Sequence, residues 1–328
     1  MNKIDIILAT AFANAVPGVE ATQQKLPGYS GTQSHVLLPR INPAYRFDKE
    51  RFLTLSYSWA REWSRTETDP RRGVWFGGPK GAGKTTVVEQ FFARLGVPVL
   101  TLTCNRRIPL SDFIQKMVPD GEGGWLKVDG ALTTAMRMGY PVVLSEPSAM
   151  DEADLIAMHD IIDRGYLVME DGDVVQAKRG FLVYATDNTM GWGDQTGAYG
   201  GTGSMNSATM RRFLKDEVDY PSPEEEIEIL QRYFPGQTQD VLRQFVDFAN
   251  AIRAPHRAGQ SPVTMGTGEV REWVECAQYF RTLAHRKENA LNPAWFAFKR
   301  IMGGIPGPEL QAARQHFQNT FQVDVTGQ

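Results

Sequence analysis

The chain has 328 residues, of which 42% are hydrophobic, and a formal net charge of −3. This length is typical of one large domain plus a smaller one. The mild acidity gives no support to a nucleic-acid partner, and no apolar run is long enough to span a bilayer, so we expect neither a nucleic-acid nor a membrane partner. Two cysteines, Cys104 and Cys276, are too few for a disulfide framework and fit a reducing cytoplasm.

The N-terminal segment, residues 4–16, is apolar and follows Lys3, a pattern that it shares with signal peptides, although Asp5 interrupts it. Its apolar residues fall on one helical face: Ile4, Ile7, Leu8, Ala11 and Phe12. We therefore expect an N-terminal helix that packs on the body or on a neighbouring subunit. Pro, Gly, Ser and Thr then predict an extended arm, so that residues 1–45 form one region.

Strands alternate with helices over residues 46–221. The predicted strands include VWF (74–76), PVLTLTC (98–104), PVVLSE (141–146) and FLVYATDN (181–188). YLVMEDGDVVQA (166–177) alternates around Asp171-Gly172, which predicts a hairpin. The pattern becomes helical from Pro221. We predict an α/β domain over 46–221, a parallel sheet sandwiched by helices, and a small all-α domain over 222–328.

A phosphate-binding loop follows the VWF strand and precedes an amphipathic helix. It fits the pattern G-x4-G-K-[ST] and comprises Gly78, Pro79, Lys80, Gly81, Ala82, Gly83, Lys84 and Thr85, with Thr86 next in the chain. The glycines allow backbone amides to wrap the phosphates of ATP, Lys84 reaches the β- and γ-phosphates, and the Thr85 hydroxyl ligates Mg²⁺. The flanking strand and helix distinguish this loop from a glycine-rich surface turn.

PVVLSE ends with the residues that would act on magnesium and water. Nucleotide hydrolases of this type place an acid for Mg²⁺ at the end of this strand, and many follow it with a glutamate that polarises water. Glu146 occupies the base position, whereas Ser145 stands where the acid is expected. The alternative for Glu146 is an ordinary surface glutamate. The rival pair Asp151-Glu152 follows PSAM rather than a strand, so we expect it to begin a helix.

Two further positions are candidates for catalysis. Asn188 ends the strand FLVYATDN and could orient the water with its amide, although a turn asparagine is the ordinary alternative. Arg211 and Arg212 precede Phe213. They are either a solvated charge pair or include an arginine finger that enters the ATP site of a neighbouring subunit.

The order of these parts resembles the MoxR branch of the AAA+ ATPases, and within it the CobS-type ATPase subunits of aerobic cobaltochelatase. The likeness is carried by LLPRINPAYRFD (37–48) and by ATDNTMGWGDQTGAYGGTGSMNSATMRRF (185–213), whose long G-D-x-T-G-x-Y loop is unusual among AAA+ proteins. It covers most of the chain and is weak at residues 1–35 and 105–128.

The resemblance implies roles for these residues. Lys84 and Thr85 bind ATP and Mg²⁺, Glu146 is the base, Asn188 the sensor, and Arg212 the finger in trans. The hairpin at 166–177 lies before the sensor, and an insertion near Trp125 faces the pore of a hexamer-like ring. Such rings usually work with a partner that carries a von Willebrand A domain; in cobaltochelatase they help a third subunit insert Co²⁺ into a corrinoid.

Two positions depart from the family. Ser145 replaces the acid before Glu146, and Gly268 stands where the helical lid domain usually has an arginine; Arg271, one turn later, is a possible substitute. We therefore expect ATP binding with slow or partner-dependent hydrolysis. Two hypotheses remain open, a ring-forming ATPase that remodels a partner complex and a nucleotide-gated scaffold that hardly turns over, and a paralogue with a client other than a chelatase is compatible with the first.

Overall fold

The computed structural model describes residues 2–193, 203, 205–284 and 291–327. The described residues form two compact units, each with its own hydrophobic core. The first is built from the chain up to Val218, apart from Pro79–Gly83, and the second combines Pro79–Gly83 with the chain from Asp219 onward. Most of the expected glycine-rich loop, residues 194–202 and 204, lies outside the described residues.

A parallel sheet of five strands, in the order β11-β3-β10-β7-β4, organises the first unit. Its strands are β3 (Val74–Gly77), β4 (Leu100–Thr103), β7 (Val142–Ser145), β10 (Val183–Asp187) and β11 (Leu214–Glu217). Runs of buried β-branched and aromatic residues form such strands when helical crossovers cover both faces. The register pairs Thr186 of β10 with Ser145 of β7, which brings the ends of the two strands together. The predicted α/β fold is confirmed.

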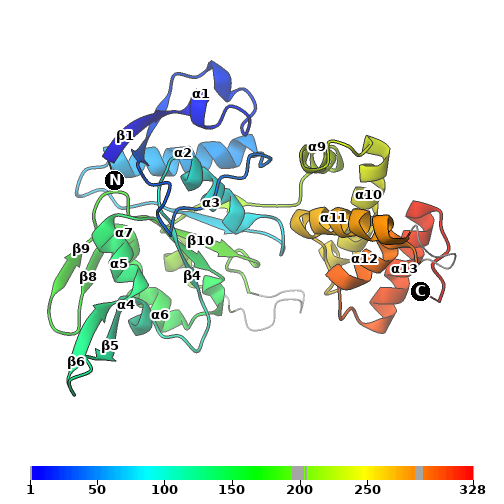
Figure 1. The fold of residues 1–328 in the computed structure, drawn as a ribbon. Helices are drawn as coiled ribbons and strands as arrows, with labels where there is room; N and C mark the ends of the chain where they lie inside the picture. The colour runs from blue at the N-terminus through cyan, green and yellow to red at the C-terminus, as the bar shows by residue number, and fades with distance from the viewer. Residues whose placement is uncertain (1, 194–202, 204, 285–290, 328) are drawn as a thin grey trace. The chain divides into compact units, whose positions relative to one another are not determined.

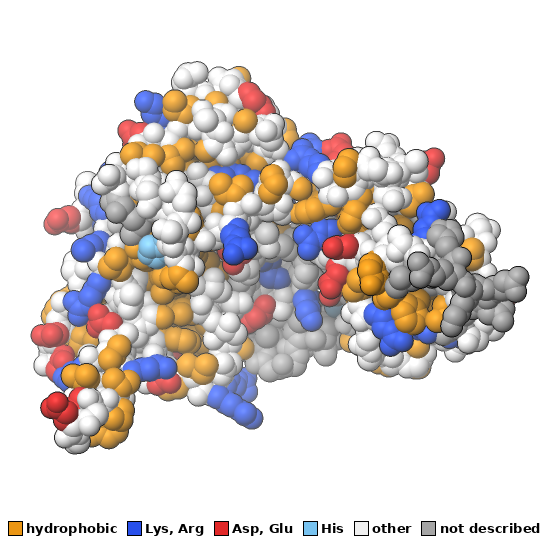
Figure 2. Space-filling model, viewed as in Figure 1, with side chains coloured by type: hydrophobic (Ala, Val, Ile, Leu, Met, Phe, Trp, Pro, Cys, Tyr) orange, Lys and Arg blue, Asp and Glu red, His pale blue; other side chains and the backbone are white. Residues whose placement is uncertain are grey.

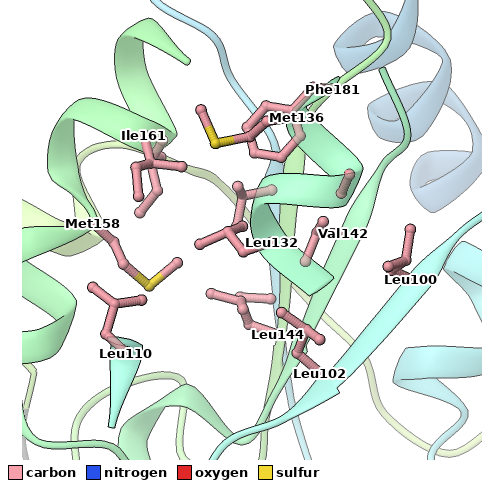
Figure 3. Close-up of a cluster of buried hydrophobic side chains, with 14 of the residues drawn as sticks. Leu100, Leu102, Leu110, Leu132, Met136, Val142, Leu144, Met158, Ile161 and Phe181 are labelled. Carbon is pink, nitrogen blue, oxygen red and sulfur yellow. The ribbon is translucent and has the colours of Figure 1, made fainter. Parts of the chain in front are cut away.

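One face of the sheet packs against α5 (Ala131–Met138) and α7 (His159–Arg164). Figure 3 shows Leu132 and Met136 of α5 in one cluster with Val142 and Leu144 of β7. Leu132 and Met136 are four positions apart and therefore point to the same side of their helix. The shorter helices α4 (Leu110–Ile114) and α6 (Glu152–Ala157) complete this layer with Leu110 and Leu155.

The opposite face packs against α3 (Lys84–Arg94) and α2 (Lys49–Ser64). Phe92 of α3 contacts Tyr184 of β10 with ring centroids 5.4 Å apart, and Trp59 of α2 lies 5.0 Å from Phe92. The Asp48 side chain caps α2 by accepting two backbone amides. The sheet therefore lies between two helical layers (Figure 1).

The N-terminus differs from the prediction. Residues Asn2–Ile7 form strand β1, not a helix, and pair antiparallel with β2 (Lys25–Ser30); only α1 (Leu8–Ala11) is helical. The β-branched residues of this segment favour a strand once a partner strand is available. A Cβ at Gly28 of β2 would lie 2.3 Å from the Leu95 carbonyl oxygen, so glycine allows β2 to approach the backbone at Leu95. Phe12, expected on the buried helical face, is nevertheless buried.

Two hairpins extend from the first unit. The hairpin predicted around Asp171-Gly172 is present as β8 (Tyr166–Val168) and β9 (Val174–Gln176). Helix α4 ends at Ile114, where β5 (Gln115–Pro119) begins and pairs with β6 (Trp125–Asp129). Hydrophobic side chains are exposed on the β5–β6 hairpin, at the lower left of Figure 2: Met117, Trp125, Leu126 and Val128.

The second unit is helical from Pro223 onward. It comprises α9 (Pro223–Tyr233), α10 (Gln239–Arg257), α11 (Thr267–Ala284), α12 (Pro293–Ile301) and α13 (Gly307–Phe321). Trp273 lies at the centre of its core, with the Phe245 ring 4.4 Å away. The buried Arg253 guanidinium binds both carboxylate oxygens of Glu226 and thereby joins α10 to α9. Among the described helices of both units, none is long and apolar enough to cross a membrane.

Candidate functional site

The glycine loop connects β3 to α3 at the carboxyl end of the sheet. Gly78, Gly81 and Gly83 have positive φ angles of 144°, 77° and 90°, which L-residues with side chains rarely adopt. A Cβ at Gly78 would lie 1.8 Å from the Val218 carbonyl oxygen. The three glycines are therefore required by the backbone path, whose following helix starts at Lys84.

The middle of the loop, Pro79–Gly83, belongs to the second unit. There the Tyr220 hydroxyl donates to the Lys80 carbonyl at 2.6 Å and contacts the Thr264 hydroxyl at 2.7 Å. The Ala82 amide donates to the Pro79 carbonyl at 3.3 Å. These bonds hold the loop backbone in a closed turn.

Lys84 is the buried cation of the site. Its Nζ donates to the Gly78 carbonyl and to Asn188 Oδ1, both at 2.8 Å. Burial lowers the pKa of the Lys84 ammonium to about 8, although the carboxylates of Glu146 and Asp187 oppose the shift. A phosphate group near Lys84 would further favour the charged form.

Thr85 and Thr186 bring two hydroxyls together, with their Oγ1 atoms 3.3 Å apart. Ser145 is the neighbour of Thr186 across the sheet and is half-buried. Mg²⁺ takes oxygen ligands and keeps several waters, so these hydroxyls beside a carboxylate fit a hydrated Mg²⁺ bound mainly through ATP. The described residues contain no cluster of three or more His, Cys, Asp or Glu side chains that could hold a metal by themselves.

Glu146 follows β7 in a left-handed conformation, with φ 57° and ψ 52°. Its backbone amide donates to the Thr186 carbonyl at 2.7 Å, and its Oε2 accepts the Asn188 amide at 3.3 Å. Burial and the nearby Asp187 raise the pKa of Glu146, whereas Lys84 and the Asn188 amide lower it. A raised pKa makes the carboxylate a better proton acceptor.

Asn188 contacts both charged groups, because its side-chain oxygen accepts from Lys84 and its backbone N–H donates to Glu146. The structure therefore brings Lys84, Glu146 and Asn188 together although the sequence separates them widely. The rival pair is elsewhere: Asp151 caps α6 by accepting the Ala153 amide at 2.9 Å, as predicted for a helix start.

Arg212 lies just beyond α8 (Ser207–Met210) and is engaged within its own chain. Its Nε is 2.9 Å from Asp163 Oδ2, and its guanidinium donates to the Ala208 carbonyl at 2.6 Å. Arg211 is exposed. The structure does not bring Arg212 to Lys84 of the same chain, and its role as a finger in trans stays a prediction.

In the second unit, Gly268 is the second residue of α11, and a Cβ built there meets nothing within 4 Å. The Arg271 guanidinium lies over the Tyr233 ring, 5.1 Å from its centroid. Arg271 therefore has a structural partner inside the helical unit.

Sequence reasoning missed three side chains that belong to this site: Thr186, Asp187 and Ser148. Strand periodicity offered a signal, because Thr186 and Asn188 are two positions apart and share a face. A second signal was Asp187 itself, since an acid at the end of a buried parallel strand needs hydrogen-bond donors.

Comparison with known proteins adds a family match. The model of the AAA domain (dynein-related subfamily) matches residues 73–213. This range contains Lys84, Glu146, Asn188 and Arg212, and it ends before the helices of the second unit.

Several curated proteins are similar in sequence. The aerobic cobaltochelatase subunit CobS from Sinorhizobium sp is 26% identical, over 99% of this chain and 96% of its own length. Protein CbbQ from Hydrogenophilus thermoluteolus is 30% identical over 56% of this chain and 65% of its own. Protein NorQ from Paracoccus denitrificans is 31% identical over 54% of this chain and 63% of its own length.

Among solved structures, a mutant of RuvB from Thermotoga maritima is similar, with a TM-score of 0.50 and 14% sequence identity. The match covers 80% of this chain and 73% of that one. At this identity the likeness supports the fold alone.

Proposed function

Because this chain belongs to the MoxR branch of the AAA+ ATPases, we propose that it binds Mg-ATP and uses hydrolysis to remodel a partner complex. The observation that carries this proposal is the contact of Lys84 with Asn188 and of Asn188 with Glu146. A cation for phosphate, an amide for water and a carboxylate base are the groups that hydrolysis of a phosphoanhydride requires.

Each group has one task in the proposed reaction. Lys84 and the loop amides bind the phosphates, and Asn188 orients the attacking water. Glu146 accepts a proton from that water. At the same time the water oxygen attacks the γ-phosphorus, and the bond from the γ-phosphorus to the leaving ADP oxygen breaks. Arg212 of a neighbouring copy stabilises the charge on the transferred group. Thr85, with Ser145 and Thr186 nearby, would hold a Mg²⁺ ion brought by ATP, and that ion would neutralise phosphate charge.

Ser145 supports a slow or partner-dependent rate. A serine hydroxyl supplies no charge to the magnesium shell, whereas the expected acid does. The substitution leaves the phosphate-binding loop, Lys84 and Glu146 in place. Binding of ATP should therefore persist while turnover suffers.

The finger in trans requires a homo-oligomer, and we propose a hexamer-like ring. We also propose a partner that carries a von Willebrand A domain, because such partners are usual for the MoxR branch. Similarity to CobS over nearly the whole chain supports cobalt insertion into a corrinoid as one client reaction. The chain's described residues offer no metal cluster of their own, so the cobalt site of such a complex would belong to another subunit.

The second candidate is a nucleotide-gated scaffold that assembles on ATP with little hydrolysis. Two observations favour it: Ser145 lacks the acid, and Gly268 lacks the lid arginine. Both features weaken catalysis more than binding.

Steady-state Mg-ATP hydrolysis by the purified chain tests the proposal. The Lys84→Ala variant is the blank, and Lys49→Ala, an exposed lysine of α2, is the matched control. Turnover that Lys84→Ala abolishes and Lys49→Ala retains would support the ATPase. Sedimentation with and without ATP reports the oligomer.

No turnover with ATP still bound would overturn autonomous hydrolysis and favour the scaffold. Repeating the assay with a von Willebrand A partner then separates a scaffold, which stays inactive, from a partner-dependent ATPase. Absence of ATP binding would overturn both.

A further inference from the structure

Asp187 is a buried carboxylate that the proposed reaction does not use. It ends β10 and has 0% exposure, and no salt bridge reaches it among the residues that the structure describes. Burying an ionised carboxylate without a paired cation is costly unless donors surround it. Its donors are the Ser148 hydroxyl, the Thr189 amide at 3.1 Å, the Thr189 hydroxyl at 2.8 Å and the Gly191 amide at 2.8 Å.

The two carboxylate oxygens serve different segments. Oδ1 accepts from Ser148, which lies in the short 3-10 turn Pro147–Ala149 directly after Glu146. Oδ2 accepts from Thr189 and Gly191, in the loop that carries Asn188. One side chain thus joins the segment of the proposed base to the segment of the proposed sensor.

Both segments contain strained backbone. Glu146 has φ 57° and Met190 has φ 52°, and neither is a glycine. The left-handed region is unfavourable for residues with a Cβ, so tertiary contacts must hold them there. The Asp187 carboxylate bonds a residue two positions after Glu146 and the residue directly after Met190.

The hydrogen bonds of Asp187 become more important for holding Asn188 in place when ATP binds. Asn188 Oδ1 accepts from Lys84, and a phosphate would compete for the same ammonium. Once the Lys84 ammonium binds a phosphate, the Asn188 side chain loses its hydrogen bond from Lys84, while the hydrogen bonds of Asp187 remain.

We propose that Asp187 is a positioning residue that couples the Glu146 and Asn188 segments and keeps the two groups aligned for catalysis when Lys84 engages phosphate. This inference rests on the proposed ATPase function. A carboxylate suits the task because donors face both of its oxygens. It acts through Glu146 and Asn188 and does not itself touch the reacting atoms.

Three variants test the coupling by turnover. Asp187→Ala removes all the bonds and should lower kcat about 100-fold, the loss expected for a misplacement of about 1 Å, with ATP affinity kept within about threefold. Ser148→Ala removes one side only and should lower kcat less. Asp187→Asn should recover part of the rate, because the Ser148 hydroxyl can reverse and accept from the new amide.

The double variant Ser148→Ala/Asp187→Ala gives the decisive comparison. If Ser148 acts through Asp187, the double variant should turn over like Asp187→Ala alone. Independent, multiplying effects would overturn the coupling. Equal losses of kcat and ATP affinity, or a kcat within twofold of the unaltered chain in Asp187→Ala, would also overturn it.

Hydrogen exchange of the Thr189 and Gly191 amides keeps the test independent of turnover. Ser148→Ala leaves their direct bonds to Asp187 intact, yet coupling predicts exchange about tenfold faster at both amides. Unchanged exchange would overturn the proposal even if the chain hydrolyses ATP, or if Asp187→Ala does not fold. Faster exchange without turnover in the unaltered chain would support the coupling and count against the ATPase function alone.

Discussion

Lys84 Nζ donates to Asn188 Oδ1 over 2.8 Å, a contact between residues 104 positions apart. It joins the cation expected to bind phosphate to the amide expected to orient water. Binding of ATP must therefore draw Lys84 away from Asn188 or share it, which couples the occupancy of the loop to the position of the sensor.

Asn188→Ala should separate binding from catalysis. Removing the competing acceptor frees Lys84 for phosphate, so ATP should bind about threefold more tightly, as expected for a modest hydrogen bond. Loss of the water-orienting amide should lower kcat about 100-fold. Titration with a fluorescent ATP analogue and steady-state hydrolysis measure the two effects. Weaker ATP binding in this variant would contradict the competition.

Ser145→Asp should restore the missing acid. We expect kcat to rise about tenfold, which corresponds to about 1.4 kcal/mol of transition-state stabilisation, and half-maximal Mg²⁺ to fall. Magnesium titrations of hydrolysis measure both quantities. Ser145→Asn is the control of equal size without charge, and the same gain in both variants would rule out the charge as the cause.

Mixing two inactive variants tests the finger in trans. Lys84→Ala lacks the phosphate cation and Arg212→Ala lacks the finger, so each should be inactive alone. In mixed rings, an intact site of one variant meets an intact Arg212 of the other, and part of the activity should return. Arg211→Ala is the matched control and should stay active alone, since Arg211 is the more exposed of the two arginines. A mixture without activity, despite mixed oligomers, would argue against Arg212 acting across subunits.

Gly268→Arg should supply the lid arginine without a steric penalty. A Cβ at this position meets nothing within 4 Å, so the first atom of the new side chain makes no clash. We expect hydrolysis to accelerate about tenfold if a cation at this position stabilises the γ-phosphate. Gly268→Ala controls for the change in helix propensity. Arg271→Ala in the same assay tells whether Arg271 already acts as the lid arginine. No gain over Gly268→Ala would remove this position from the mechanism.

The cysteines should differ in reactivity. Burial raises the pKa of the Cys104 thiol to about 12, and its thiolate is therefore scarce at pH 8, whereas Cys276 is only half-buried. A disulfide reagent at pH 8 should label one cysteine in the native chain and both in denaturant. Cys276→Ser should abolish the native labelling. Native labelling of Cys104 would mean that the strand end beside Ser145 opens readily.

Several local elements of this fold could be predicted from the sequence. The glycine loop, its flanking strand and helix, and the Asp171-Gly172 hairpin depend on backbone rules that act over a few residues. The helix expected within residues 4–16 forms only at Leu8–Ala11, for the complementary reason. The apolar residues do have helical spacing, but residues 2–7 pair with β2 as strand β1. Pairing between segments distant in the sequence overrides the local preference for a helix.

The sequence by itself determined the parallel α/β fold and the glycine loop that connects β3 to α3. The positions of Glu146 and Asn188 at strand ends were also readable, because buried strands and glycine loops follow from local composition. Only the tertiary structure decided which side chains meet. The order β3-β10-β7 brings Lys84, Asn188 and Glu146 into contact. Burial then sets the pKa of Lys84 and surrounds Asp187 with donors, because desolvation depends on everything packed around a group and not on its neighbours in the chain.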